Sequence, residues 1–103
     1  MAGYAIVNAP QVGPAVTTQP ASQTATESAP ATFIAAASGY PAPTVGWQVS
    51  TDGRATFSQV SGATTGTLTI PNATLAQNGD EYEAVFTNVA GSATANPAML
   101  TVP

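Results

Sequence analysis

Three segments in which apolar and polar residues alternate constrain the fold of this chain most strongly. They span residues 30–38, 44–50 and 80–88. Their apolar positions, which fall on one side of each segment, are Phe33, Ala35, Ala37, Val45, Trp47, Val49, Tyr82, Ala84 and Phe86. A period of two predicts β-strands with one buried face. Trp47 is the only tryptophan, and its large apolar area marks the expected centre of the core.

Further short strands are expected on both sides of these segments, separated by turns. A first strand at 15–26 is expected to break at Gln19-Pro20, because proline lacks the N–H that a central strand needs. The others are a hairpin partner ending at Val60, a strand at 67–70 and a last strand at 92–102. Leu75, in the following loop, is expected to tuck into the core. The chain therefore reads as an all-β domain with no helical segment.

The last strand changes phase near its middle. Ala93 and Ala95 fall on one side, whereas Ala98, Leu100 and Val102 require the opposite parity. One extra residue near Asn96-Pro97 would restore a common buried face. The sequence therefore predicts a β-bulge at that point.

Composition excludes several classes of function. The chain has 103 residues, enough for one domain, and carries one Arg and five acidic residues, for a net charge of −4. A single cation cannot neutralise a run of phosphates, so nucleic acid and anionic membranes are excluded as partners. No apolar run is long enough to insert into a membrane. The absence of Cys means that no disulfide stabilises the fold.

The same composition argues against catalysis. Without Lys there is no Schiff-base chemistry, and without His or Cys the many Ser and Thr hydroxyls lack the usual activating base. A carboxylate pair, Glu81 and Glu83, lies on one strand face, but a flat face provides no cleft for glycoside hydrolysis. We therefore expect no enzyme activity and no cofactor.

Two long stretches resemble a known family. PATFIAAASGYPAPTVGW, ending at Trp47, and LTIPNATLAQNGDEYEAVFTNVAG, ending at Gly91, resemble the B–C and E–F–G regions of intermediate-set immunoglobulin domains. The similarity extends over residues 14–102 and is strongest to the cysteine-free versions repeated in large bacterial surface or secreted proteins. It implies a Greek-key immunoglobulin-like β-sandwich of about seven antiparallel strands at 14–103. Residues 1–13 would then be a lead-in or linker, with an extra edge strand as the alternative.

The resemblance assigns structural roles to four core residues. Ala35 and Ala84 match the two positions that hold the inter-sheet disulfide in vertebrate members, and Trp47 matches the residue that packs on it. Tyr82 matches the tyrosine whose hydroxyl bonds back to the E–F corner. Asn78 stands where the family usually has Asp, so the familiar Arg–Asp bridge is missing. No catalytic, cofactor or metal residue is implied.

The function implied by the resemblance is structural. The chain would be a spacer or adhesion module of an extracellular or cell-surface bacterial multidomain protein, with neighbouring domains as its partners. The alternatives are an accessory module that binds a protein or glycan ligand, in a secreted enzyme or a phage structural protein, and a cysteine-free engineered scaffold. The sequence does not separate a natural Ala35/Ala84 pair from an introduced one.

Several motifs have a functional and a purely structural interpretation. Asp52, Asp80, Glu81 and Glu83 could form a Ca²⁺ site, but more simply they solvate an exposed face. Ser50-Thr51-Asp52-Gly53-Arg54-Ala55-Thr56-Phe57 resembles the Asp-box hairpin, with Arg54 where Gly is expected and Phe57 in place of Trp. That motif is structural in its own family. Asn72-Ala73-Thr74 matches a glycosylation sequon, interpreted as accidental. Tyr4 and Tyr40 are candidate exposed aromatics for stacking on a sugar or a partner.

Overall fold

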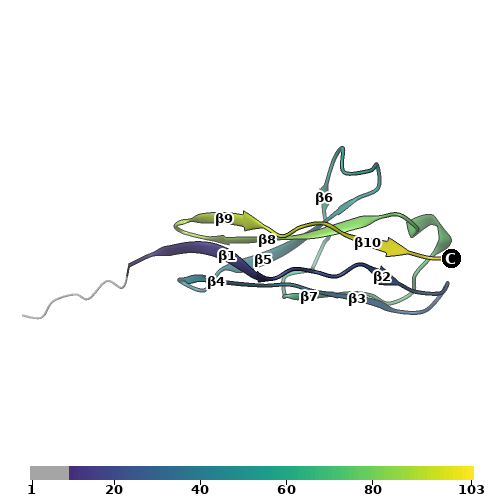
Figure 1. Cartoon of the computed structure of the whole chain (residues 1–103), viewed down its shortest axis with the longest axis horizontal. Helices are drawn as coiled ribbons and strands as arrows, with labels where there is room; N and C mark the ends of the chain where they lie inside the picture. Colours follow the sequence, from purple (N-terminus) through teal and green to yellow (C-terminus); the bar gives the residue numbers. More distant parts are fainter. Residues whose placement is uncertain (1–9) are drawn as a thin grey trace, which may run out of the picture.

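A computed structural model of the chain describes residues 10–103 and shows two packed β-sheets (Figure 1). The expectations for Tyr4 and for most of the 1–13 segment lie outside these residues. The elements in chain order are β1 (Val12–Thr18), β2 (Gln23–Thr24), β3 (Ala31–Ile34), β4 (Ala36–Tyr40), β5 (Thr44–Ser50), β6 (Ser58–Gln59), β7 (Thr67–Ile70), the 3₁₀ turn η1 (Leu75–Gln77), β8 (Glu81–Asn88), β9 (Gly91–Thr94) and β10 (Ala98–Thr101).

The strand segments combine into the seven expected strands. One layer contains the antiparallel pairs β1–β4 and β3–β7, in which β3 and β4 are halves of one strand interrupted at Ala35. The other layer has the order β2-β10-β8-β5-β6, with β9 also paired to β8. The pairs are antiparallel except β2–β10, which is parallel. The first strand breaks at Gln19-Pro20, as predicted: β1 pairs in one sheet and β2 in the other.

The core fills the space between the two layers. Its buried apolar residues are Ala25, Ala31, Phe33, Ala35, Trp47, Leu68, Ala73, Tyr82, Ala84, Phe86, Ala95, Ala98, Leu100 and Val102. The rings of Phe33 and Tyr82 lie with their centroids 5.1 Å apart. The indole Nε1–H of Trp47 donates to the Thr65 carbonyl at 2.8 Å, so this fully buried ring leaves no polar group unsatisfied.

The expectation that Leu75 joins the core is wrong. Its side chain is 54% exposed, because the short η1 turn carries it away from the sheets. Thr74 caps this turn, with its backbone N–H donating to the Gln77 side chain at 2.9 Å. Ala73, which is 1% exposed, fills the position under the corner instead. A small residue is sufficient there because Ser28 and Ala29 bond directly to its backbone.

The predicted β-bulge in the last strand is confirmed by the register. Thr94 lies opposite Val85, and Ala98 lies opposite Tyr82. Between these two pairs the last strand advances by four residues while β8 advances by three. One extra residue therefore lies in the last strand near Asn96. The N–H of Asn96 donates to the Gln19 side-chain carbonyl at 2.7 Å. The break in the first strand therefore supplies the acceptor for the bulge in the last.

Two backbones approach closely where β3 meets β4. The N–H of Ala35 donates to the Gly66 carbonyl at 2.9 Å, just before β7 begins. A Cβ atom added at Gly66 would lie 2.5 Å from the Ala35 carbonyl oxygen. Glycine is therefore needed at this position for lack of space. This contact aligns the two strands beside Trp47.

Candidate binding groove

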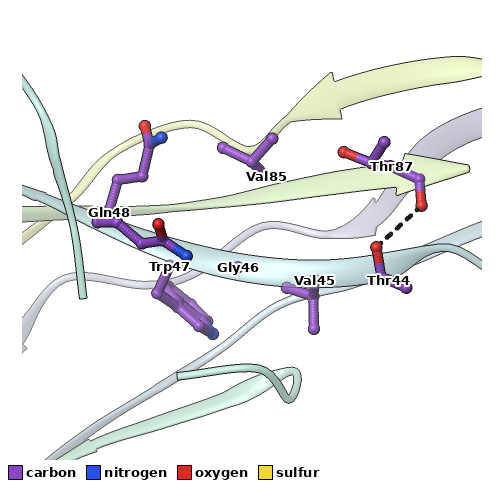
Figure 2. Close-up of a pocket in the computed structure, with 8 residues that line it drawn as sticks. Thr44, Val45, Gly46, Trp47, Gln48, Val85 and Thr87 are labelled. Atoms are coloured by element: carbon purple, nitrogen blue, oxygen red, sulfur yellow. Dashed lines mark hydrogen bonds between the residues drawn. The ribbon is translucent and has the colours of Figure 1, made fainter. Parts of the chain in front are cut away.

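A shallow groove lies on the outer face of the layer that contains β5, β6 and β8. It has a volume of about 320 Å³ and is lined by Thr44, Val45, Gly46, Trp47, Gln48, Gln59, Val85 and Thr87. Figure 2 shows Gln48, Val85 and Thr87 on one side of β5 and β8, while the Trp47 and Val45 side chains point to the opposite side, into the core. Gly46 forms the floor, because it adds no side chain between its neighbours.

The groove is uncharged and offers hydrogen-bonding groups. The two amide side chains, Gln48 and Gln59, come from directly opposite positions of β5 and β6. The Thr44 hydroxyl donates to the Thr87 carbonyl at 3.2 Å, which fixes the far end. Such a surface can bond hydroxyl or amide groups, but it carries no exposed aromatic ring and no catalytic group. Sequence reasoning missed this groove; the signal was Gly46, a residue without a side chain between two outward polar positions of a strand.

The turn after β5 is organised by one carboxylate. The backbone N–H of Thr56 donates to Asp52 Oδ1 at 2.9 Å, and the Thr56 and Ser50 hydroxyls also donate to this carboxylate. These bonds lower the pKa of Asp52 to about 2, and the bond from the Thr56 hydroxyl contributes most. Arg54 has a φ of 76°, in the left-handed region where the Asp-box has Gly. The turn thus has the Asp-box hydrogen bonds and remains a structural feature.

The expectation that the four acids solvate an exposed face is wrong for Glu81 and for Asp80, which are both buried. Glu81 is 5% exposed, and its Oε1 accepts from Arg54 Nε at 2.6 Å. The turn at Asp52 positions Arg54 over β8, because Ser50 lies opposite Glu81 in the ladder and the Ser50 hydroxyl accepts the Arg54 N–H at 2.8 Å. The single cation of the chain therefore pairs with a buried acid, a contact that strand periodicity could not reveal.

The acidic residues do not assemble into a metal site. Within residues 10–103, no group of three or more His, Cys, Asp or Glu side chains could hold a metal ion. Burial raises the pKa of Asp80, which is 8% exposed, and burial also raises the pKa of Glu83 while Arg54 opposes that rise. The Ca²⁺ interpretation of these acids thus has no geometric support in the described chain.

The four residues singled out from the resemblance lie together in the core. Ala35, Trp47, Tyr82 and Ala84 are each at most 3% exposed. Trp47 and Ala84 are directly opposite in the β5–β8 ladder. Burial, with a contribution from the charge of Asp80, raises the pKa of the Tyr82 hydroxyl to about 12.

The corner between η1 and β8 is held by Asn78. The backbone N–H of Val102 donates to Asn78 Oδ1 at 2.9 Å, and the Gly79 N–H donates to the Leu100 carbonyl at 2.8 Å. The expectation that the Tyr82 hydroxyl bonds back to this corner is wrong, because the side-chain hydrogen bonds within residues 10–103 include none from Tyr82. Asn78, which occupies the usual Asp position of the family, therefore joins the corner to the last strand.

Exposed apolar side chains gather at the pole where the described chain begins. Val12, Tyr40 and Val89 are 54%, 53% and 72% exposed. Val12 pairs with Tyr40, and Asn88 Nδ2 donates to the Val12 and Pro41 carbonyls at 2.8 and 2.9 Å. We call Val12, Tyr40 and Val89 the apolar pole. Tyr40 is exposed as predicted, but the sequence did not show that Val12 and Val89 accompany it.

Two packed layers of strands around a central buried Trp form an immunoglobulin-like β-sandwich, here without cysteine. The immunoglobulin domain family model matches residues 13–88. The chain therefore belongs to the immunoglobulin domain family. Among residues 10–103, no helix has the length and apolar character needed to cross a membrane.

Known proteins agree with this assignment. The chain is 52% identical over 89 residues to Endoglucanase C of Cellulomonas fimi, a match that covers 86% of the chain but 8% of that enzyme. A chimeric titin Z1Z2 structure is 33% identical, with a TM-score of 0.69, covering 92% of this chain and 98% of that one. Sidekick-1 immunoglobulin domains 1–5 are 27% identical, with a TM-score of 0.70, covering 90% and 20%. The chain thus spans a small fraction of its bacterial relative.

Proposed function

We propose that this domain is a non-catalytic spacer of a larger extracellular or cell-surface bacterial protein. The observation that carries the proposal is the path of the chain: β1 begins at one pole, and the chain leaves β10 at the other (Figure 1). A domain with this path separates its two neighbours by the length of the sandwich. The 52% identity to a segment that makes up 8% of an endoglucanase supports a place beside other domains.

The relative also supports an extracellular location. The relative is named as an endoglucanase, an enzyme that acts on a glucan, and polymeric glucans occur outside the cell. The absence of Lys, His and Cys from the whole chain supports a role without chemistry of its own. Activity in the larger protein would then belong to another domain.

The apolar pole supports contact with a preceding domain. Tyr40 and Val89 present apolar surface at the end where the chain enters. Asn88 fixes this surface by bonding to the first strand and to the turn after β4 at the same time. A neighbour seated on a rigid apolar surface is held at a defined angle, which is the property that distinguishes a spacer from a flexible linker.

A domain exchange in the larger protein tests the spacer role. One variant replaces residues 10–103 by an unrelated β-sandwich of similar length, and a second replaces them by a Gly/Ser linker. We expect the first to keep the activity of the parent on a polymeric substrate and the second to lower it. If the unrelated sandwich lowers activity as much as the linker does, this domain contributes more than separation.

The groove supports a second candidate function, binding of a glucan chain. Its Gln48 and Gln59 amides match the hydroxyl groups of a sugar, and the relative is an enzyme that acts on a glucan. Titration with soluble gluco-oligosaccharides, followed by amide chemical shifts, tests this. We expect shifts around Gly46 that the Gln48→Ala variant loses and the Gln77→Ala variant, altered outside the groove, retains. Shifts that are absent, or equal in both variants, would exclude the groove as a glucan site.

A further inference from the structure

The strand β7 forms an open edge of its sheet. Within residues 10–103 it pairs with β3 alone. The connection that precedes it turns to the other layer: the Val60 N–H donates to the Trp47 carbonyl at 2.8 Å, and the Trp47 N–H donates to the Ala63 carbonyl at 3.3 Å. No strand of the described chain therefore covers the free side of β7 (Figure 1).

The register identifies which backbone groups face this edge. Ala35 and Gly66 lie in line with the β3–β7 pairs and are joined by a hydrogen bond, so they form a hydrogen-bonded pair. Because bonded and non-bonded pairs alternate in an antiparallel ladder, Leu68 also bonds to β3, whereas Thr67 and Thr69 do not. The N–H and C=O groups of Thr67 and Thr69 consequently point away from β3. The Thr67 carbonyl accepts from the Thr65 hydroxyl at 3.1 Å and keeps a second lone pair.

The edge lacks the usual protection against pairing. Natural edge strands carry charges, proline or bulges that discourage a second chain. The stretch from Ala55 to Gly79 contains no charged residue, and its one proline, Pro71, follows the end of β7. Thr67 and Thr69 are exposed β-branched residues, which suit a paired strand. A cavity of about 260 Å³ separates the strand from the preceding connection, because Val60, Ala63 and Thr65 line it together with Thr67 and Thr69.

We propose that β7 pairs with β7 of a second copy of this chain, antiparallel, about a two-fold axis at Leu68. In this register Thr67 lies opposite Thr69 of the partner subunit. The two threonines exchange both backbone hydrogen bonds, and symmetry repeats the exchange, for a total of four. The outward threonines of the two copies then form cross-strand pairs. The pairing joins the layer that contains β3 and β7 in one copy to the same layer of the second copy, as one continuous sheet.

A second copy is favoured over another partner because the edge is self-complementary. Thr67 and Thr69 each present one N–H and one C=O along the free edge. In an antiparallel copy, every one of these donors therefore lies opposite an acceptor. The net charge of −4 comes from residues outside the 55–79 stretch, so an approach along this edge brings neutral surfaces together. Four residues bury little area, so we expect a dissociation constant on the order of 0.1–1 mM.

The test is sedimentation equilibrium of the whole chain across that concentration range. Thr69→Lys places a charge at the edge, and Thr32→Lys is the matched control, because Thr32 is exposed and lies directly opposite Thr69 on the same face but away from the edge. We expect the wild-type and Thr32→Lys proteins to dimerise alike. The Thr69→Lys variant should weaken dimerisation by about tenfold or more.

Amide hydrogen exchange provides a second readout. The Thr67 and Thr69 amides should gain protection as concentration rises, whereas the amides of β6, whose residues are also exposed, should not. Thr69→Pro removes the Thr69 donor without touching a bond to β3, so it should also abolish this protection. A chain that stays monomeric up to about 1 mM, or a dimer that Thr69→Lys and Thr32→Lys affect equally, would overturn the proposal.

Discussion

Replacing Gly66 by Ala tests the close approach of two backbones at Ala35. The new Cβ would lie 2.5 Å from the Ala35 carbonyl oxygen, whereas ordinary contact begins near 3.4 Å. Because the contacted atom is a backbone oxygen, the clash can be removed only if the two strands move apart. That movement strains the hydrogen bond between them. Overpacking of this kind costs about 1–3 kcal/mol, and a weakened hydrogen bond adds about 0.5–1.5 kcal/mol. The lower entropy of unfolded Ala returns about 0.4–1 kcal/mol.

We therefore expect Gly66→Ala to lower the free energy of unfolding by about 2–3 kcal/mol, which for a domain of this size lowers Tm by roughly 10–20 °C. Urea and thermal unfolding followed by fluorescence measure both values, because Trp47 is the only tryptophan and is fully buried. Gly46→Ala is the control, since nothing lies within 4 Å of a Cβ added there. If the two variants unfold alike, the close approach at Ala35 does not constrain the fold.

Three further predictions concern charge and the core. Asp52 has a lowered pKa of about 2, so its contribution to stability is present above the unfolded pKa near 4 and is lost as pH falls toward 2; Asp52→Asn should remove that part of the acid transition in a pH series of urea melts. Burial raises the pKa of Asp80, so its charge destabilises the fold at neutral pH, and Asp80→Asn should raise the urea midpoint at pH 7 but not at pH 2, where the wild-type carboxyl is already protonated. Replacing Ala35 and Ala84 together by Cys should give an oxidised form stabilised by up to about 4 kcal/mol, and free thiols in the folded, oxidised protein by mass spectrometry would show that the two positions do not face each other.

The fold could be predicted because it depends on local periodicity. Alternation placed the strands around Phe33, Trp47 and Tyr82, and the change of phase near Asn96 located the bulge. These features require only that one face of each strand be buried. Leu75 could not be placed in this way, because a 3₁₀ turn follows no period of two, and an apolar residue in it can point either way.

The surface features could not be predicted, because they depend on contacts between distant residues. Alternation places Glu81 on the outer face, yet a turn some thirty positions earlier in the chain brings Arg54 over it. The apolar pole similarly requires Val12, Tyr40 and Val89 to meet from three separate segments. A single sequence contains the residues of such sites without the register that brings them together.

The parallel pairing of β2 with β10 determines how the domain would respond to tension. If its two ends are pulled apart, β2 is drawn toward its start and β10 toward its end, so the hydrogen bonds between them are loaded in shear. Bonds in shear share the load and break together, whereas bonds peeled from one end break in turn. The backbone N–H groups of Met99 and Asn96 donate to the side-chain oxygens of Ser22 and Gln19, and these bonds extend the sheared contact. The domain should therefore keep its length under drag on its neighbours, up to the force at which this whole contact fails.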